Sequence, residues 1–263
     1  MTLDFSLDRT IEIRAARATV FRFFTDSARW ARWWGAGSTV EPRVGGAVEI
    51  VYPGDVRVTG VVKELVPDER FVFTYGYERT SKPATDPQEA MRRTMPPGTS
   101  LVTITLSSAG PITRLELRHD IADAATRDDH VQGWRYQLAR FAHVVGDDAY
   151  AAATDHVAAW VAAWNEPDAA KRRALLVNAV ASDMRFRDAH GDVYGLDELL
   201  GHIGAVHQFM PGAHLEARGT LRRSHDTALA DWAITAGDKT LMTGTNVIRF
   251  GSDAKIADVV GVG

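Results

Sequence analysis

The first half of the chain shows strand-like patterns that give way to a helical spacing. Alternation of apolar and polar residues, and runs rich in β-branched residues, predict strands at residues 10–14, 48–52, 56–66, 70–77, 101–106 and 113–119. Short apolar helical faces are expected around residues 20–34. Four prolines within residues 78–98 predict a long irregular connection between two strands. From residue 127 to 145, apolar side chains recur every three or four positions, which predicts one long helix with a single buried stripe.

The second half shows the opposite order, with helices before most of its strands. Helical spacing covers residues 149–165, 167–177 and 196–209, and strands are predicted at 184–187, 213–223, 227–236, 240–250 and 254–260. The first helical pattern ends at Gly146, before two acidic residues, so we place a domain boundary there and expect domains 1–146 and 147–263. Both domains are expected to be α+β: an antiparallel sheet followed by a long helix, then a cone-shaped domain with a curved antiparallel sheet.

Composition excludes several classes of protein. The formal net charge is −4 and no long basic stretch is present, which argues against a nucleic-acid-binding protein. The chain has no cysteine, so disulfides, thiolate nucleophiles and cysteine metal sites are absent. No apolar run approaches the roughly 18 residues of a membrane span. We therefore expect a cytoplasmic protein with no membrane association.

Short motifs follow one another in a distinctive order between residues 5 and 145. They are Val20-Phe21-Arg22-Phe23-Phe24-Thr25-Asp26, Trp33-Trp34-Gly35, Val44-Gly45-Gly46, Gly60-Val61-Val62, Pro67, Leu115-Glu116-Leu117-Arg118-His119 and Gly133-Trp134. In order and spacing this region resembles the activator-of-heat-shock-ninety-ATPase-like branch of the SRPBCC superfamily. The resemblance implies a START-like helix-grip fold, and most such bacterial domains are ligand-binding modules. It does not imply a chaperone role.

A second set of motifs lies between residues 149 and 263. They are Trp160-Val161-Ala162-Ala163-Trp164-Asn165 with Asp168, Phe186-Arg187-Asp188 with Gly191 and Gly195, Asn246-Val247-Ile248-Arg249-Phe250, and the tail from Lys255 to Gly261. This region resembles the SnoaL-like branch of the nuclear-transport-factor-two-like superfamily. The resemblance implies a cone-shaped fold that encloses a pocket and commonly dimerises through its open sheet.

Asp188 is the candidate general base of the second domain. In the ketosteroid isomerases of the superfamily that this domain resembles, the base follows the first strand, just before a turn and a glycine, and Asp188 occupies the matching place. Burial at the mouth of an apolar pocket raises the pKa of a carboxyl group, which helps it remove a proton beside a carbonyl. The structural alternative is an Asx turn, in which Asp188 bonds the backbone of residues 189–191.

The same resemblance assigns the groups that would hold a developing enolate oxygen. Trp160 and Asn246 stand where those isomerases use a tyrosine and a protonated aspartate. An indole N–H and an amide can each donate, but neither reproduces the short bond from an acidic hydroxyl, which weakens the case for steroid isomerisation. His202 is a candidate acid/base partner of Asp188. The alternative is that His202 is a structural histidine of the rim or core, with its hydrogen bonds made within the protein.

Aromatic side chains are the candidate pocket lining in both domains, and ordinary core packing is the alternative for each of them. The candidates are Trp160, Trp164, Phe186 and Trp232 in the second domain, and Trp34, Tyr75, His119 and Trp134 in the first. Arg92-Arg93 could meet an anionic group. His202 and His207 are about 140° apart on one helix, and no metal-ligand, phosphate-loop or serine-nucleophile motif is present. No metal and no cofactor are expected.

These observations favour a two-domain protein that binds a hydrophobic or aromatic small molecule in an apolar pocket of each domain. The alternative is an isomerase, cyclase or hydratase that acts on a cyclic ketone or polyketide-like substrate with Asp188 as base. A third hypothesis is an interaction protein, with a homodimer formed through the C-terminal sheet.

Overall fold

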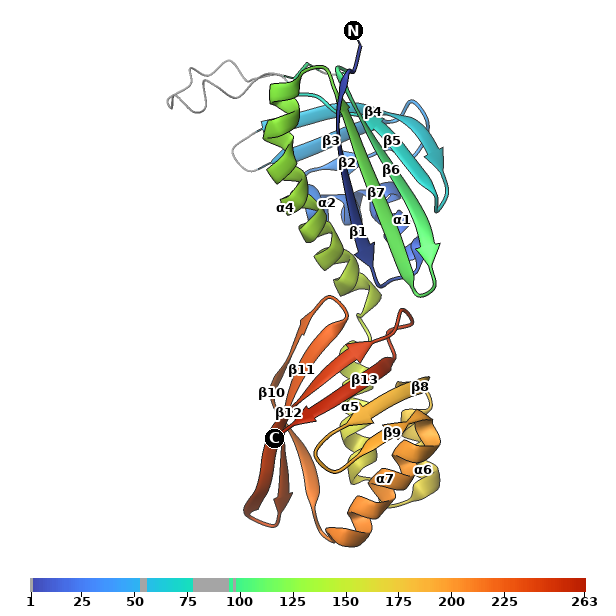
Figure 1. Cartoon of the computed structure of the whole chain (residues 1–263), viewed down its shortest axis with the longest axis vertical. Helices are drawn as coiled ribbons and strands as arrows, with labels where there is room; N and C mark the ends of the chain where they lie inside the picture. Colours follow the sequence, from blue (N-terminus) through green and yellow to red (C-terminus); the bar gives the residue numbers. More distant parts are fainter. Residues whose placement is uncertain (1, 53–55, 78–94, 97) are drawn as a thin grey trace. The chain divides into compact units, whose positions relative to one another are not determined.

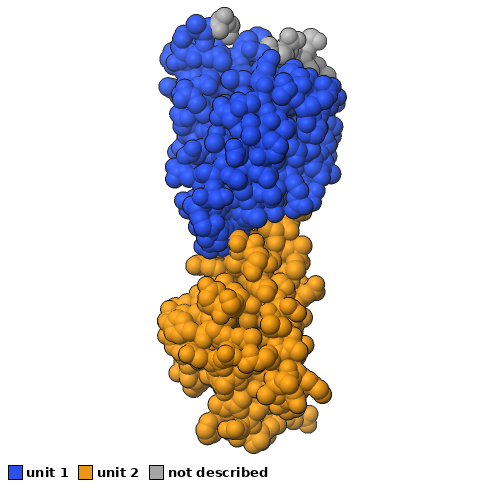
Figure 2. All heavy atoms as spheres, turned by 90° about the vertical axis from the view of Figure 1, so that its right-hand side faces the viewer, with its two compact units in different colours: residues 1–145 blue, residues 146–263 orange. Residues whose placement is uncertain are grey.

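The chain folds into two compact units, Met1–Val145 and Gly146–Gly263 (Figure 2). The computed structural model describes residues 2–52, 56–77, 95–96 and 98–263. The pair Arg92-Arg93 lies outside the described residues. In the described part of the chain, no helix is both long enough and apolar enough to cross a membrane.

The first unit is built on a seven-stranded antiparallel sheet with the order β1-β7-β6-β5-β4-β3-β2 (Figure 1). Its strands are β1 (Phe5–Ile13), β2 (Thr39–Val40), β3 (Ala47–Tyr52), β4 (Val56–Val66), β5 (Arg70–Thr74), β6 (Ser100–Ala109) and β7 (Ile112–Ile121). The hairpin between β6 and β7 turns at Gly110, whose φ of 58° favours glycine. Strand β1 pairs with β7 along its full length, from Phe5 opposite Ile121 to Ile13 opposite Thr113.

Three helices of the first unit share one face of this sheet. They are α1 (Arg17–Thr25), α2 (Ser27–Trp34) and α4 (Ala124–Ala149). Phe24 of α1 stacks on Phe71 of β5 and on Phe141 of α4, with ring centroids 5.8 and 5.0 Å apart, and Trp30 of α2 contacts Phe73 of β5 at 5.7 Å. The predicted α+β fold, with a long helix after the first sheet, is confirmed. Aromatic side chains from the three helices and from β5 therefore line the inner face of the sheet.

The second unit has a six-stranded sheet with the order β10-β11-β12-β13-β8-β9 (Figure 1). The strands are β8 (Val180–Arg187), β9 (Asp192–Tyr194), β10 (His214–Ser224), β11 (Thr227–Ala236), β12 (Lys239–Phe250) and β13 (Ile256–Val262), and the helices are α5 (Ala153–Asn165), α6 (Ala169–Leu176) and α7 (Gly195–Phe209). The expected antiparallel pairing holds except between β13 and β8, which are parallel. Helix α5 is tied to β10 because the Asn165 amide accepts from the Leu215 N–H at 2.7 Å and donates to the Leu215 carbonyl at 2.8 Å.

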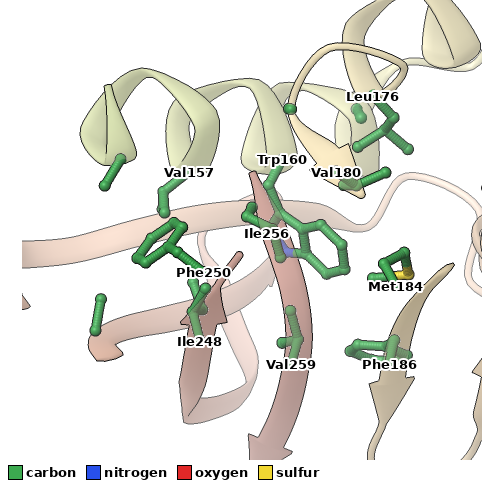
Figure 3. Close-up of a cluster of buried hydrophobic side chains, with 14 of the residues drawn as sticks. Val157, Trp160, Leu176, Val180, Met184, Phe186, Ile248, Phe250, Ile256 and Val259 are labelled. Carbon is green, nitrogen blue, oxygen red and sulfur yellow. The ribbon is translucent and has the colours of Figure 1, made fainter. Parts of the chain in front are cut away.

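The core of the second unit lies between its sheet and helix α5. Figure 3 shows Trp160 of α5 among side chains from β8, β12 and β13. The buried strand residues of this core are Val180, Met184 and Phe186 of β8, Ala228 of β11, Ile248 and Phe250 of β12, and Ile256 and Val259 of β13. Side chains alternate along a strand, and the bulge between Ile256 and Asp258 lets Ile256 and Val259 share one face, so these positions define the inner face of the sheet.

Candidate functional site

The structure brings together all four aromatic candidates of the first unit. Trp34 of α2 contacts Trp134 of α4 with ring centroids 5.6 Å apart, and His119 of β7 contacts Trp134 at 5.8 Å. Tyr75, just after β5, lies 5.3 Å from His119 and 6.5 Å from Trp34. All four side chains are buried. With His130 of α4, 5.3 Å from His119, they form what we term the first ring cluster.

A directed chain of hydrogen bonds fixes the tautomer of His119. The indole N–H of Trp134 donates to His119 Nδ1 at 3.0 Å, so the proton of the neutral imidazole is on Nε2. His119 Nε2 then donates to Ser100 Oγ at 3.0 Å, and that hydroxyl donates to the Tyr75 carbonyl. Burial, with a smaller contribution from His130, lowers the pKa of His119 well below its usual value. His119 is therefore a neutral, fully satisfied part of the cluster.

Two tyrosines at the first ring cluster bond to each other through uncharged hydroxyl groups. The hydroxyls of Tyr52 and Tyr75 lie 3.2 Å apart, so one donates to the other. Burial is the main cause that raises the pKa of both phenols, that of Tyr52 well above 10. Tyr52, Ser100 and His130 were not among the candidates from the sequence. The spacing of His130 and Trp134, one helical turn apart on α4, is the signal that would have found His130.

The second unit gathers four of its candidates into another group of rings. Trp160 and Trp164 of α5 lie 5.9 Å apart, and both contact Phe186 of β8, at 5.8 and 5.5 Å. His202 of α7 lies 5.4 Å from Phe186 and 5.8 Å from Trp164. We term these four residues the second ring cluster. Glycine allows the close approach of His202 to the turn after β8, because a Cβ on Gly191 would lie 2.7 Å from His202 Cε1.

Asp188 and Asn246 flank one glycine on the inner face of the second sheet. A Cβ on Gly261 would lie 3.2 Å from the Asp188 Cβ and 3.4 Å from Asn246 Oδ1. Gly261 and Asn246 are direct partners across β13 and β12, and by strand alternation they share the inner face with Val259 and Ile248. The turn itself holds Asp188, since its Oδ1 accepts the His190 N–H at 2.7 Å, as in the Asx turn considered from the sequence.

Trp232 extends the same inner face beyond Asn246. Its ring covers two glycines, because a Cβ on Gly244 or on Gly263 would lie 2.5 or 3.3 Å from ring atoms of Trp232. Asn246 is mostly buried, and Trp232 is partly exposed. Across the described ranges, no group of three or more His, Asp or Glu side chains is placed to hold a metal ion.

Several polar atoms in or near the two ring clusters are buried without a hydrogen-bond partner among the described residues. In the second unit these are the indole Nε1 atoms of Trp160, Trp164 and Trp232, and in the first unit they are Trp34 Nε1 and Gln137 Oε1. Most buried polar groups in folded proteins are paired with protein or with water. These atoms therefore carry hydrogen-bonding capacity that the described residues leave unused.

Comparison with known families assigns both units. Residues 14–146 match the family described as Activator of Hsp90 ATPase homolog 1-like protein, slightly more than half of the chain. The chain belongs to this family. Residues 157–259 match the SnoaL-like domain, so the two resemblances inferred from the sequence are confirmed in their order. Below, the first unit is the AHSA1-like unit and the second is the SnoaL-like unit; both are kinds of domain that bind small molecules.

Solved structures of several proteins are similar to one unit or the other. A candidate isomerase of the SnoaL-like family from Agrobacterium tumefaciens is 28% identical, covering 41% of this chain and 93% of its own, with a TM-score of 0.40. An AHSA1-like protein from Rhizobium etli is 28% identical, covering 54% of this chain and 81% of its own, also with 0.40. The Aha1 dimer from Colwellia psychrerythraea is 15% identical, covering 51% and 90%, with 0.39. No curated protein matched the chain.

Proposed function

We propose that the protein binds flat, largely apolar small molecules on the inner face of each sheet. The observation that carries this proposal is the set of buried polar atoms without partners, Trp34 Nε1 and Gln137 Oε1 in the AHSA1-like unit and three indole Nε1 atoms in the SnoaL-like unit. Leaving such an atom unpaired costs about 1–3 kcal/mol. A ligand that carries a hydrogen-bond acceptor offsets this cost at an indole N–H while its rings contact the neighbouring aromatic side chains.

Deleting one unpartnered N–H is expected to weaken the binding of an acceptor-bearing aromatic ketone. For 2-acetylnaphthalene and the full-length protein, Trp164→Phe should raise the Kd by about 3- to 10-fold, the equivalent of one hydrogen bond. Isothermal titration calorimetry measures the change. Trp30→Phe is the matched control, because the indole N–H of Trp30 already donates to the Glu49 carbonyl at 3.2 Å. Equal Kd values for Trp164→Phe and the unchanged protein would contradict the assignment of that N–H.

Native mass spectrometry of the full-length protein tests the proposal without a chosen ligand. Comparison of native and denatured masses reveals any molecule retained from the expression host. The same spectra report the oligomeric state, which tests our proposal of a homodimer through the sheet of the SnoaL-like unit. If the native spectra show no retained small molecule and 2-acetylnaphthalene does not bind detectably, the binding proposal is wrong.

A second candidate function rests on the pair formed by Asp188 and Asn246 around Gly261. We propose that, with a cyclic ketone bound there, Asp188 removes a proton from the carbon beside the carbonyl and returns it to the γ-carbon of a β,γ-unsaturated substrate. Asn246, with His202 or Trp160, would donate to the enolate oxygen. Both the proton and the electrons of the double bond are conserved in this isomerisation, so no further reactant is required.

Asp188→Asn is expected to abolish this isomerisation while leaving ligand binding unchanged. The amide oxygen of asparagine can still accept the His190 N–H, so the turn is kept and only the base is lost. Conversion of 3-cyclohexen-1-one to its conjugated isomer, followed by ultraviolet absorbance, should fall by about 10²- to 10⁴-fold. Asp183→Asn, at an exposed aspartate of β8, is the control. Equal rates for the two variants would show that Asp188 serves the turn alone.

A further inference from the structure

His130 is the member of the first ring cluster that presents a hydrogen-bond acceptor. Its Nδ1 lies 2.7 Å from the carbonyl oxygen of Thr126, one turn earlier on α4. A carbonyl oxygen only accepts, so Nδ1 must carry the proton, and in the neutral ring Nε2 keeps a free lone pair. No described residue donates to that lone pair, and the side chain is half-buried.

The surroundings of His130 keep the imidazole neutral. Burial is the main cause that lowers its pKa, opposed by the Thr126 hydrogen bond and by the charges of Asp129 and Asp123. In the part of the fold that the structure describes, the rings that face His130 from other elements are uncharged: the phenols of Tyr75 and Tyr77, with centroids 5.9 and 6.5 Å away, and the neutral imidazole of His119. At neutral pH, His130 Nε2 is therefore an acceptor and not a cation.

The rings around this atom define the shape of what can bind to it. His130 lies nearly perpendicular to both His119 and Tyr75, at 87° and 85°, and Tyr75 in turn contacts Trp34 and Trp134. Nδ1 faces the Thr126 carbonyl of its own helix, and because the two ring nitrogens flank Cε1 with widely diverging directions, Nε2 is directed away from that carbonyl. A flat molecule bonded to Nε2 would contact these rings by edge or by face.

The charge of the ligand follows from the same neighbours. A carboxylate would place its negative charge against a lone pair and near the two aspartates that act on His130. A hydroxyl group instead supplies the proton that Nε2 lacks. We propose that the AHSA1-like unit selects an uncharged aromatic molecule by a hydroxyl group, of phenol or enol type, that donates to His130 Nε2. This inference rests on the proposed binding function and adds the ligand class and the residue that selects it.

The test compares two probes that differ in a single hydroxyl hydrogen. For the full-length protein at pH 7.5, 2-naphthol should bind about 3- to 10-fold more tightly than 2-methoxynaphthalene, as measured by calorimetry. His130→Phe should abolish this preference and leave 2-methoxynaphthalene binding within about twofold, while His130→Gln, which places an amide oxygen at a similar reach, should restore part of it. His143→Phe, at an exposed histidine of α4 outside the first ring cluster, is the control and should keep the preference.

The outcomes separate this inference from the proposed function. Equal binding of the two probes, or a preference that survives His130→Phe, overturns the selection by His130 and leaves the binding function standing. Failure of both probes to bind overturns the binding function of this unit and the inference with it. If His130→Phe does not fold, ¹⁵N spectra of the unsubstituted protein with labelled histidine provide the test. The Nε2 resonance of His130 should shift with 2-naphthol and not with 2-methoxynaphthalene. The absence of a shift with 2-naphthol overturns the inference.

Discussion

Trp160→Ala should destabilise the SnoaL-like unit by about 3–5 kcal/mol, as expected for the removal of a fully buried tryptophan. The side chain is 1% exposed and lies at the centre of the core between α5 and the sheet (Figure 3). Its ring contacts Trp164 and Phe186, so truncation leaves a cavity that neither neighbour fills without leaving its rotamer. The loss is a large fraction of the usual stability of a domain.

Hydrogen exchange of the full-length protein locates this effect. Amides of β8, β12 and β13 should lose protection in Trp160→Ala, and amides of the AHSA1-like unit should keep theirs. Phe209→Ala is the matched control, since Phe209 is also aromatic but is 83% exposed, and its loss should change stability by less than about 0.5 kcal/mol. Unchanged protection in β8 of Trp160→Ala would contradict the role of Trp160 in the core.

Acid should destabilise the AHSA1-like unit through His119. In the folded unit the pKa of His119 lies well below 6.5, so the folded state does not bind this proton at mildly acidic pH. The unfolded chain binds it as the pH falls through about 6.5. Below that pH the unfolded state therefore carries more protons, and the free energy of unfolding falls by up to about 1.4 kcal/mol per pH unit until the lowered pKa is reached.

Urea unfolding between pH 7.5 and pH 5 measures this loss, to which His130, whose pKa is also lowered, adds in the same direction. His119→Gln should be less stable at pH 7.5, because it breaks the chain from Trp134 to Ser100, but its stability should fall less steeply with acid. His143→Gln, at an exposed histidine of α4, should retain the full slope. A slope that is the same in His119→Gln and the unchanged protein would show that other groups cause the acid sensitivity.

The sequence predicted the elements whose signal is local, and it missed those that depend on distant partners. The long helix and the hairpin strands were visible because their apolar residues follow periods of 3.6 and 2. The parallel pairing of β13 with β8 joins Val259 to Phe186, far apart along the chain, and no local pattern encodes it. Pairing also explains why β8 begins at Val180, opposite Ile256, and not at residue 184.

The candidate sites divide in the same way. The concave face of a sheet and the apolar stripe of a helix must meet, which predicts that aromatic residues from both lie together. The structure confirms these contacts for Trp34, Tyr75, His119 and Trp134. His130 and Ser100 were missed, since their importance comes from tautomers and hydrogen-bond directions that a sequence does not display. The sequence around Asp188 is the same whether the aspartate serves a turn or acts as a general base. The structure adds that Asp188 lies beside Gly261 and Asn246, which are far from it along the chain.

The place of β13 in its sheet has a consequence for synthesis on the ribosome. Helices α5 to α7 and strands β8 to β12 all emerge before β13, yet β13 lies between β12 and β8. Until it arrives, the strands on its two sides have no common sheet, and the core around Trp160 lacks Ile256 and Val259. The nascent SnoaL-like unit is thus exposed to aggregation, or to capture by chaperones, for almost the whole of its translation, whereas the sheet of the AHSA1-like unit already has all its strands.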